Sequence, residues 1–330
     1  MSWQGGAGVP KIYEDGGPAF HAGTPEDVRV AVAAITAGVE DGLHRDAAPW
    51  EKFHHAFGPG SDVPERLTRI RYGNTEAADR ELDALSDMLC HQGTPNAVGA
   101  LALPFLIRIA PHRPHPRLLL LIGALARRPH LGDGTRGGLL RTSPLPGTLI
   151  FEPSGYVATW SIQAARQALT ADADLLLPLL DHTDPAVRTG AAYALSAVAA
   201  PARDRVAAAL HAHLGAEDGP VTRASLVLGI GQLAWEERDG ATIACTRTWW
   251  RDLARPAEVR MSAALAWLCL VDDPVPTELD ALLDQTPTGP LAGLLAPVPW
   301  LLDAHPENGL HTVLTQMRNP DDYAWIASTY

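Results

Sequence analysis

The segment VRTGAAYALSAVA, from Val187 to Ala199, decides the fold, because two later segments align with it without a gap. They are TRASLVLGIGQLA, which begins at Thr222, and VRMSAALAWLCLV, which begins at Val259, so the spacings are 35 and 37 residues. Apolar and small residues fall in register in all three segments. The second position of each segment is an arginine, namely Arg188, Arg223 and Arg260. Self-similarity at this period is typical of stacked helical repeats.

A shorter sequence match extends the repeat toward the N-terminus. The sequence LPFL at 103–106 matches LPLL at 177–180, and the two lie 74 residues apart, which is two periods of 37. A single helical hairpin cannot bury its apolar face alone, so hairpins stack into one continuous core with a concave face. The pattern therefore predicts an all-α solenoid. A proline inside the first helix of a hairpin would kink that helix.

Two stretches resemble a known family. TDPAVRTGAAYALSAVA at 183–199 resembles the unit of HEAT-repeat proteins, and the chain from Trp50 onward resembles a group of bacterial proteins with HEAT-like, phycobilisome-lyase-like repeats. The group's pattern is a tryptophan, a His-Ala-aromatic-Gly run, a His-Gln-Gly-Thr run and an Ala-x-Pro-Phe-Leu helix. In this chain the matching positions are Trp50, His55 to Gly58, His91 to Thr94 and Leu103 to Leu106. The resemblance covers residues 45–270 and implies a right-handed α-solenoid of helical hairpins, but no particular chemistry.

The chain divides into five predicted parts. Residues 1–23 are rich in glycine and read as a poorly ordered segment, 24–128 as N-terminal helical repeats, and 129–155 as a long Gly/Pro-rich loop. Residues 156–271 hold the HEAT-like repeats, and 272–330 read as a C-terminal helical cap. Within the second part, we expect a helix capped by Thr24, a short helix from Trp50 to Phe57, and a helix from Asn74 that ends at Gly93.

The charge of the chain limits the classes of partner that it is expected to bind. The formal net charge is −12, and no basic stripe is visible, which disfavours nucleic acid and anionic membranes. A basic protein or peptide suits this charge better. No apolar run is long enough to span a membrane. The three cysteines, Cys90, Cys245 and Cys269, form no CxxC pair, and with no signal-peptide pattern the chain is predicted to be cytoplasmic.

The repeated arginines and the polar triplet Cys90-His91-Gln92 have structural interpretations. We expect each arginine to pair with a loop acid of its own or the adjacent unit, with Asp184 and Asp218 in suitable places. We expect His91 and Gln92 to cap the last helical turn before Gly93. No metal or cofactor is predicted, because the histidines at 112, 115 and 130 are irregularly spaced, and the His-Glu pairs of iron-binding repeat enzymes are absent.

The candidate binding residues come from the loop and from the repeats. They combine polar side chains with large aromatic rings, and the tryptophans among them suit either core packing or a protein-binding hot spot. They are His91, Gln92, Arg136, Arg141, Trp160, Tyr193, Gln232, Trp235 and Trp267.

Three functions remain open at this point. The first is a non-catalytic scaffold that grips a protein or peptide on its concave face, for example as an immunity protein. The second is an enzyme that modifies a small molecule or peptide, with its active site under the 129–155 loop. The third is a HEAT-like DNA glycosylase, which the acidic charge disfavours. A cavity beneath the loop with His, Asp or Glu on its walls would favour the enzyme.

Overall fold

The computed structural model describes residues 26–38, 48–128, 135–144, 149–152, 155–284 and 289–319. The structure is 70% helical, which confirms the predicted all-α class. No helix in these ranges is both long and apolar enough to cross a membrane. The predicted cap at Thr24 lies outside the described residues.

The N-terminal part contains five helices within the described residues. They are α2 (Val28–Gly38), α3 (Val63–Tyr72), α4 (Thr75–Leu89), α5 (Ala97–Ile109) and α6 (Pro116–Leu125). Asn74 caps α4 through its side-chain oxygen, which accepts a hydrogen bond from the backbone N–H of Ala77. Pro104 lies inside α5, as the sequence predicts.

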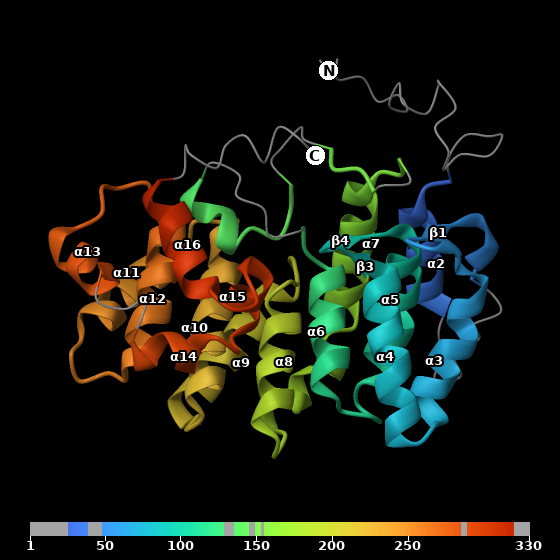
Figure 1. Cartoon of the computed structure of the whole chain (residues 1–330), viewed down its shortest axis with the longest axis horizontal. Coiled ribbons are helices and arrows are strands. Elements are labelled where there is room, and N and C mark those ends of the chain that lie inside the picture. Colours follow the sequence, from blue (N-terminus) through green and yellow to red (C-terminus); the bar gives the residue numbers. More distant parts are fainter. Residues whose placement is uncertain are drawn as a thin grey trace.

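Two short β-hairpins stand at one end of these helices (Figure 1). The first pairs β1 (His54–His55) with β2 (Gly58–Pro59), and the second pairs β3 (Cys90–His91) with β4 (Thr94–Pro95). The helix predicted from Trp50 to Phe57 is therefore wrong. The chain there forms the 3₁₀ turn η2 (Trp50–Lys52) and then becomes extended at Phe53.

The predicted end of α4 at Gly93 is also wrong, because the helix ends at Leu89. Gln92 and Gly93 both have positive φ angles, 50° and 79°. Two such residues in succession make the tight turn that matches the twist of a two-stranded ribbon. His91 and Gln92 thus belong to a hairpin and do not cap the helix.

The second half of the chain is a succession of helices joined by short turns. They are α7 (Ala158–Ala171), α8 (Pro185–Leu195), α9 (Arg203–Ala216), α10 (Pro220–Trp235), α11 (Gly240–Arg251), α12 (Ala257–Leu270), α13 (Thr277–Asp284), α14 (Pro290–Leu295), α15 (Pro299–Ala304) and α16 (Gly309–Arg318). Three other 3₁₀ helices occur at η4 (Arg136–Leu139), η5 (Ala173–Leu175) and η6 (Leu177–Asp181), besides η3 (Gly60–Asp62) near the first hairpin. The LPLL sequence therefore forms a 3₁₀ helix, whereas LPFL lies in an α-helix.

Helices α6, α8, α10 and α12 pack side by side in chain order and form one row (Figure 1). The preceding elements η6, α9 and α11 pack on α8, α10 and α12 respectively. The three aligned segments of the sequence thus occupy equivalent places. Glycine allows the close approach between neighbours: a Cβ at Gly231 would lie 2.7 Å from the Cβ of Ala266 in α12.

Ion pairs connect successive members of the row. Arg188 binds Glu217 at 2.7 Å, and Arg223 binds Glu258 at 2.5 Å. Arg260, in the third segment, donates instead to the backbone oxygen of Trp250. Pairing across adjacent units is confirmed, but the acids are not the predicted ones. Asp184 is already used to cap α8, where it accepts from the N–H of Ala186.

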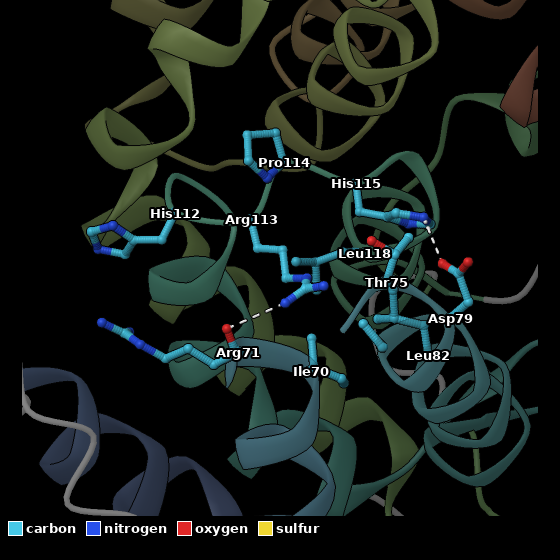
Figure 2. Close-up of a pocket in the computed structure, with 11 residues that line it drawn as sticks. Ile70, Arg71, Thr75, Asp79, Leu82, His112, Arg113, Pro114, His115 and Leu118 are labelled. Atoms are coloured by element: carbon cyan, nitrogen blue, oxygen red, sulfur yellow. Dashed lines mark hydrogen bonds and ion pairs between the residues drawn. The ribbon is translucent and has the colours of Figure 1, made fainter. Parts of the chain in front are cut away.

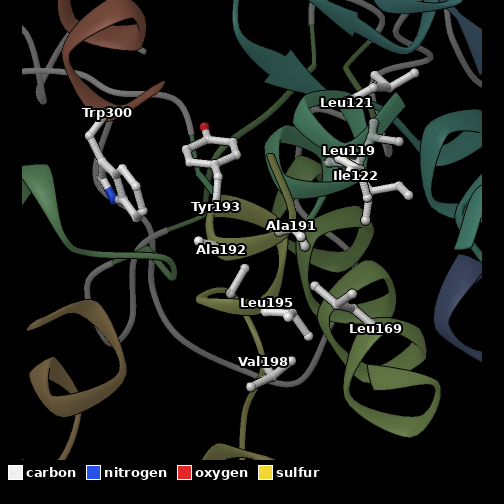
Figure 3. Packing of buried hydrophobic residues seen from close by; sticks show 14 of the residues in the cluster. Leu119, Leu121, Ile122, Leu169, Ala191, Ala192, Tyr193, Leu195, Val198 and Trp300 are labelled. Carbon is white, nitrogen blue, oxygen red and sulfur yellow. The ribbon is translucent and has the colours of Figure 1, made fainter. Parts of the chain in front are cut away.

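The C-terminal helices close one side of this row. Figure 3 shows Trp300 of α15 facing Tyr193 of α8, with Leu119 and Ile122 of α6 near Ala191 on the other side. The rings of Tyr193 and Trp300 meet edge to face at 5.0 Å. Trp300 is 1% exposed, so the C-terminal helices contribute to the same core as the repeats.

Candidate binding site

A cavity of about 420 Å³, here called the hairpin cavity, lies at the two β-hairpins. Its polar lining comes from β1, from the β3–β4 hairpin, from the residue before α5 and from the end of the 129–155 loop. These lining residues are His55, His91, Gln92, Thr94, Asn96 and Glu152. The His-Ala-Phe-Gly and His-Gln-Gly-Thr runs, which carry the resemblance to HEAT-like proteins, therefore meet around one cavity.

Backbone and side-chain contacts hold the two hairpins together. The N–H of Ala56 donates to the carbonyl of Met88, at the end of α4. Asn96 donates from its side chain to the same carbonyl at 2.7 Å, and its oxygen accepts from Gly99 as the cap of α5. The ring of Phe57, which is 65% exposed, stands 5.3 Å from the ring of His91.

His55 has a structural place in the wall. Its Nδ1 accepts a hydrogen bond from the N–H of Phe57 at 3.1 Å, which leaves the proton on Nε2. Nε2 faces Asp62 at 3.3 Å. Both ring nitrogens are thus engaged, and the side chain is almost fully buried. His55 shapes the first hairpin and has no ring nitrogen free for acid–base work.

Glu152 brings a carboxylate to the cavity. It accepts from the N–H of Ala97, the first residue of α5, at 2.9 Å, and from the hydroxyl of Ser161 in α7 at 3.3 Å. The N-terminus of a helix carries partial positive charge, which stabilises an anion there. Although only 6% of Glu152 is exposed, it lines the cavity and makes the wall acidic. No local sequence pattern marks Glu152, because 55 positions separate it from Ala97.

The lining of the hairpin cavity also includes polar groups without protein partners. The side chains of His91, Gln92 and Thr94 have no hydrogen-bond partner within the described residues. Gln92 also holds a left-handed backbone conformation that glycine adopts more readily. Polar groups without protein partners on a concave surface are the ordinary means of orienting a ligand.

Cys90 is adjacent to this wall but is not an activated nucleophile. Burial raises the pKa of its thiol to about 12. A reactive cysteine has a lowered pKa, because the thiolate is the attacking species. Cys90 therefore keeps its proton at neutral pH and serves as a packing residue at the end of α4.

Only His91 and Gln92 among the nine candidate residues line the hairpin cavity. Arg141 lies over the ring of Trp235 at 4.9 Å, where the 129–155 loop crosses α10. Arg136 donates to the backbone oxygen of Asp273 at 2.6 Å. These three residues hold the loop against the repeats.

The remaining four candidates are in packing contacts. Trp267 is buried beside Trp250, with ring centres 6.0 Å apart. Trp160 meets Tyr156 edge to face at 5.9 Å. Tyr193 and Gln232 are buried in the polar network described next.

A polar network joins α6, α8, α10 and α15. Gln232 donates to the backbone oxygen of Ser196 at 2.8 Å and accepts from the indole N–H of Trp300 at 2.7 Å. Arg127 lies 3.6 Å from the ring centre of Tyr193, whose hydroxyl donates to Asp303. Burial raises the pKa of Tyr193 well above its usual value of 10. The network fixes four elements relative to one another.

The described residues contain no group of three His, Cys, Asp or Glu side chains placed to hold a metal ion. His115 pairs with Asp79 at 3.0 Å, and His130 lies outside the described ranges.

In comparisons with known proteins, neither a family model, nor a curated protein, nor a solved structure matches the chain.

Proposed function

We propose that this chain is a HEAT-like helical-repeat protein that binds a protein or peptide without catalysis, and that the hairpin cavity receives a basic side chain of that partner. The observation that carries the proposal is the convergence of both hairpins on one cavity with unused polar groups on its wall. The partner's lysine or arginine would lie between the Glu152 side of the cavity and the Phe57–His91 pair.

The regular row of helices supports the repeat interpretation. The aligned segments at 187, 222 and 259 lie in neighbouring helices of that row, and each is covered by the element that precedes it. The Arg188–Glu217 and Arg223–Glu258 pairs recur between successive units. Repeated contacts of this kind are what a right-handed solenoid of helical hairpins requires.

Most of the titratable side chains of the cavity already make hydrogen bonds within the protein, which favours binding over catalysis. A general acid or base needs a proton-carrying atom that is free to reach the substrate. Both nitrogens of His55 are engaged, and Glu152 accepts from Ala97 and Ser161. Among the residues that line the hairpin cavity, only His91 presents an imidazole without a hydrogen-bond partner in the described structure.

Charge favours a basic partner. The chain carries a formal net charge of −12, which steers a positively charged protein toward it. Glu152 adds a carboxylate at the cavity, and Asp62 lies next to its wall through His55. The exposed ring of Phe57 offers a face for a cation–π contact with an incoming guanidinium or ammonium group.

Affinity capture from the native cell with quantitative mass spectrometry tests the proposal. The baits are the unaltered protein, Phe57→Ala, His91→Ala and the control Tyr72→Ala, because Tyr72 is an aromatic residue of similar exposure, 67%, outside the hairpin cavity. We expect one basic protein to be recovered with the unaltered chain and with Tyr72→Ala. Its recovery should fall at least about tenfold with the two cavity variants, as for a hot-spot residue.

Equal recovery with all four baits would reject the hairpin cavity as the recognition site. Capture of a small molecule and no protein would reject the binding-protein proposal. That second outcome would favour the alternative function, an enzyme that uses the His91 imidazole and the Glu152 carboxylate of the same cavity. The placement of these two residues on one cavity is the specific observation behind that alternative. Turnover of the captured molecule that is lost in His91→Gln would establish it.

A further inference from the structure

A second cavity, here called the turn cavity, lies where the turn between α3 and α4 faces the turn between α5 and α6 (Figure 2). Its volume is about 370 Å³, which is adequate for a small organic molecule. Its walls combine cationic side chains with an apolar floor, although the chain as a whole is acidic. No feature of the proposed protein-binding function uses it.

Arg113 is fixed in the wall of this cavity by the end of α3. Its Nη1 donates to the carbonyl of Gly73 at 2.6 Å and to that of Arg71 at 3.5 Å. Its Nε and Nη2 atoms donate to no atom of the described residues. A guanidinium that the protein already orients loses little further freedom when its remaining N–H groups bind an anion.

Other donors surround the same space. The hydroxyl of Thr75 and the ring of His112 have no hydrogen-bond partner in the part of the chain that the structure describes. Arg71 contributes a second guanidinium, which lies over the ring of Tyr72 and forms no ion pair within the described ranges. Figure 2 shows Arg113 between His112 on one side and Thr75 on the other.

The floor of the turn cavity and its wall at Asp79 limit the size and the charge of a ligand. Ile70, Leu82 and Leu118 lie at the floor and are at most 1% exposed, so the apolar surface left for a ligand is small. On the far wall, Asp79 pairs with His115 at 3.0 Å. The carboxylate of Asp79 repels a dianion more strongly than a monoanion, which disfavours phosphate.

We propose that the turn cavity binds a monoanionic carboxylate that carries a compact apolar group. Arg113 and Thr75 bind the carboxylate, and the compact apolar group lies against the floor of the cavity. Two sources have this chemistry, a free organic acid and the C-terminus of a peptide that ends in an apolar residue. The turn cavity and the hairpin cavity share no lining residue, so this proposal does not rest on the proposed function.

Titration calorimetry on the full chain tests the proposal with N-acetyl-leucine as the probe. We expect saturable binding of N-acetyl-leucine, and none of its amide, which lacks the charge. Arg113→Gln should weaken binding at least about tenfold, because a charge-assisted hydrogen bond is lost. Thr75→Val, at an exposed helix start, should weaken binding about threefold to tenfold without unfolding the chain.

Arg80→Gln is the matched control, since Arg80 lies on α4, is exposed and does not line the cavity. It should bind like the unaltered protein, and so should His91→Ala in the hairpin cavity. A pentapeptide ending in leucine that binds more tightly than N-acetyl-leucine identifies a peptide C-terminus as the source, and weaker binding identifies a free acid. The proposal is overturned if N-acetyl-leucine does not bind, if Arg113→Gln and Arg80→Gln bind alike, or if inorganic phosphate binds more tightly.

Discussion

The row formed by α8, α10 and α12 and the end of the molecule at the two hairpins use polar side chains in opposite ways. In the row, the polar groups bind one another: Arg223 binds Glu258, and Gln232 bridges Ser196 and Trp300. At the hairpins, His91, Gln92 and Thr94 stand beside a cavity with no hydrogen-bond partner in the described structure. The contrast indicates that the row fixes the shape of the molecule, whereas the hairpin end keeps polar groups available for a ligand.

The largest change in the free energy of unfolding is expected from Trp300→Ala, which tests whether α15 packs on the row of helices as part of one core. The substitution removes a side chain that is 1% exposed and leaves the side-chain oxygen of Gln232 without its donor. We expect the free energy of unfolding to fall by about 3 to 5 kcal/mol. Urea denaturation followed by circular dichroism measures it.

Leu253→Ala is the control for that measurement, because Leu253 is 79% exposed. We expect it to change the free energy of unfolding by less than about 0.5 kcal/mol. A loss below about 1 kcal/mol in Trp300→Ala would contradict the view that α15 forms part of the same core as the repeats.

A smaller, pH-dependent effect is expected from Glu217→Gln. The hydrogen bond from Arg188 holds the pKa of Glu217 below its usual value of 4.5. The carboxylate therefore contributes stability that is fully present above the unfolded-state pKa and is lost as the pH falls through the folded-state pKa. At pH 7 we expect the substitution to lower the free energy of unfolding by roughly 1 to 2 kcal/mol.

Denaturation curves between pH 7 and pH 3 separate this effect from a simple loss of packing. The unaltered protein should lose stability more steeply below about pH 5 than Glu217→Gln does. Asp83→Asn is the control, because the pair of Asp83 with Arg117 is more than half exposed on both sides. It should leave the slope unchanged. Parallel curves for Glu217→Gln and the unaltered protein would contradict the assigned role.

The smallest effect compares two residues with the same unusual backbone, one in each region. Gln92 has φ 50° and Arg238 has φ 49°. Gln92→Gly should relieve the left-handed conformation and raise the free energy of unfolding by about 0.5 kcal/mol, after the greater freedom of glycine in the unfolded chain is subtracted. Its binding to the captured partner should weaken.

Arg238→Gly should show no such gain. The side chain of Arg238 donates to the backbone oxygen of Cys269 in α12, and this contact is lost with the substitution. Thermal melts of both variants measure the difference. If Gln92→Gly were destabilised as much as Arg238→Gly, the side chain of Gln92 would have a structural contact, and it would not be reserved for a ligand.

The repeats were the most predictable part of the fold. The gapless alignment at 187, 222 and 259 placed three helices correctly, because a helix in a stack depends on a local pattern of small and apolar residues. The hairpins were missed because their strands are two residues long and carry no alternating pattern. The partner of Arg188 was missed because Asp184 caps the start of α8 instead.

The candidate site was predictable only at His91 and Gln92, which the sequence marked as a polar cluster beside a glycine. Glu152 reaches the cavity because α5 and α7 pack together, and no local pattern encodes that contact. Trp267 and Tyr193 were candidate binding residues, and both are buried. A tryptophan or tyrosine in a repeat suits a core as well as a binding surface, and sequence alone does not distinguish these.

The hydroxyl of Tyr156 accepts from the N–H of Val28 at 2.9 Å, across 128 positions of the chain, and donates to the carbonyl of Glu26, across 130 positions. Helix α2 packs on α5 and α7, and it buries Val28, Val32 and Ile35 there. During translation, α2 therefore leaves the ribosome long before α7 is available, whereas α10 finds α8 already made. The apolar face of α2 therefore stays uncovered until α5 and α7 have been made, and we expect a chaperone that acts on the nascent chain to contact this helix.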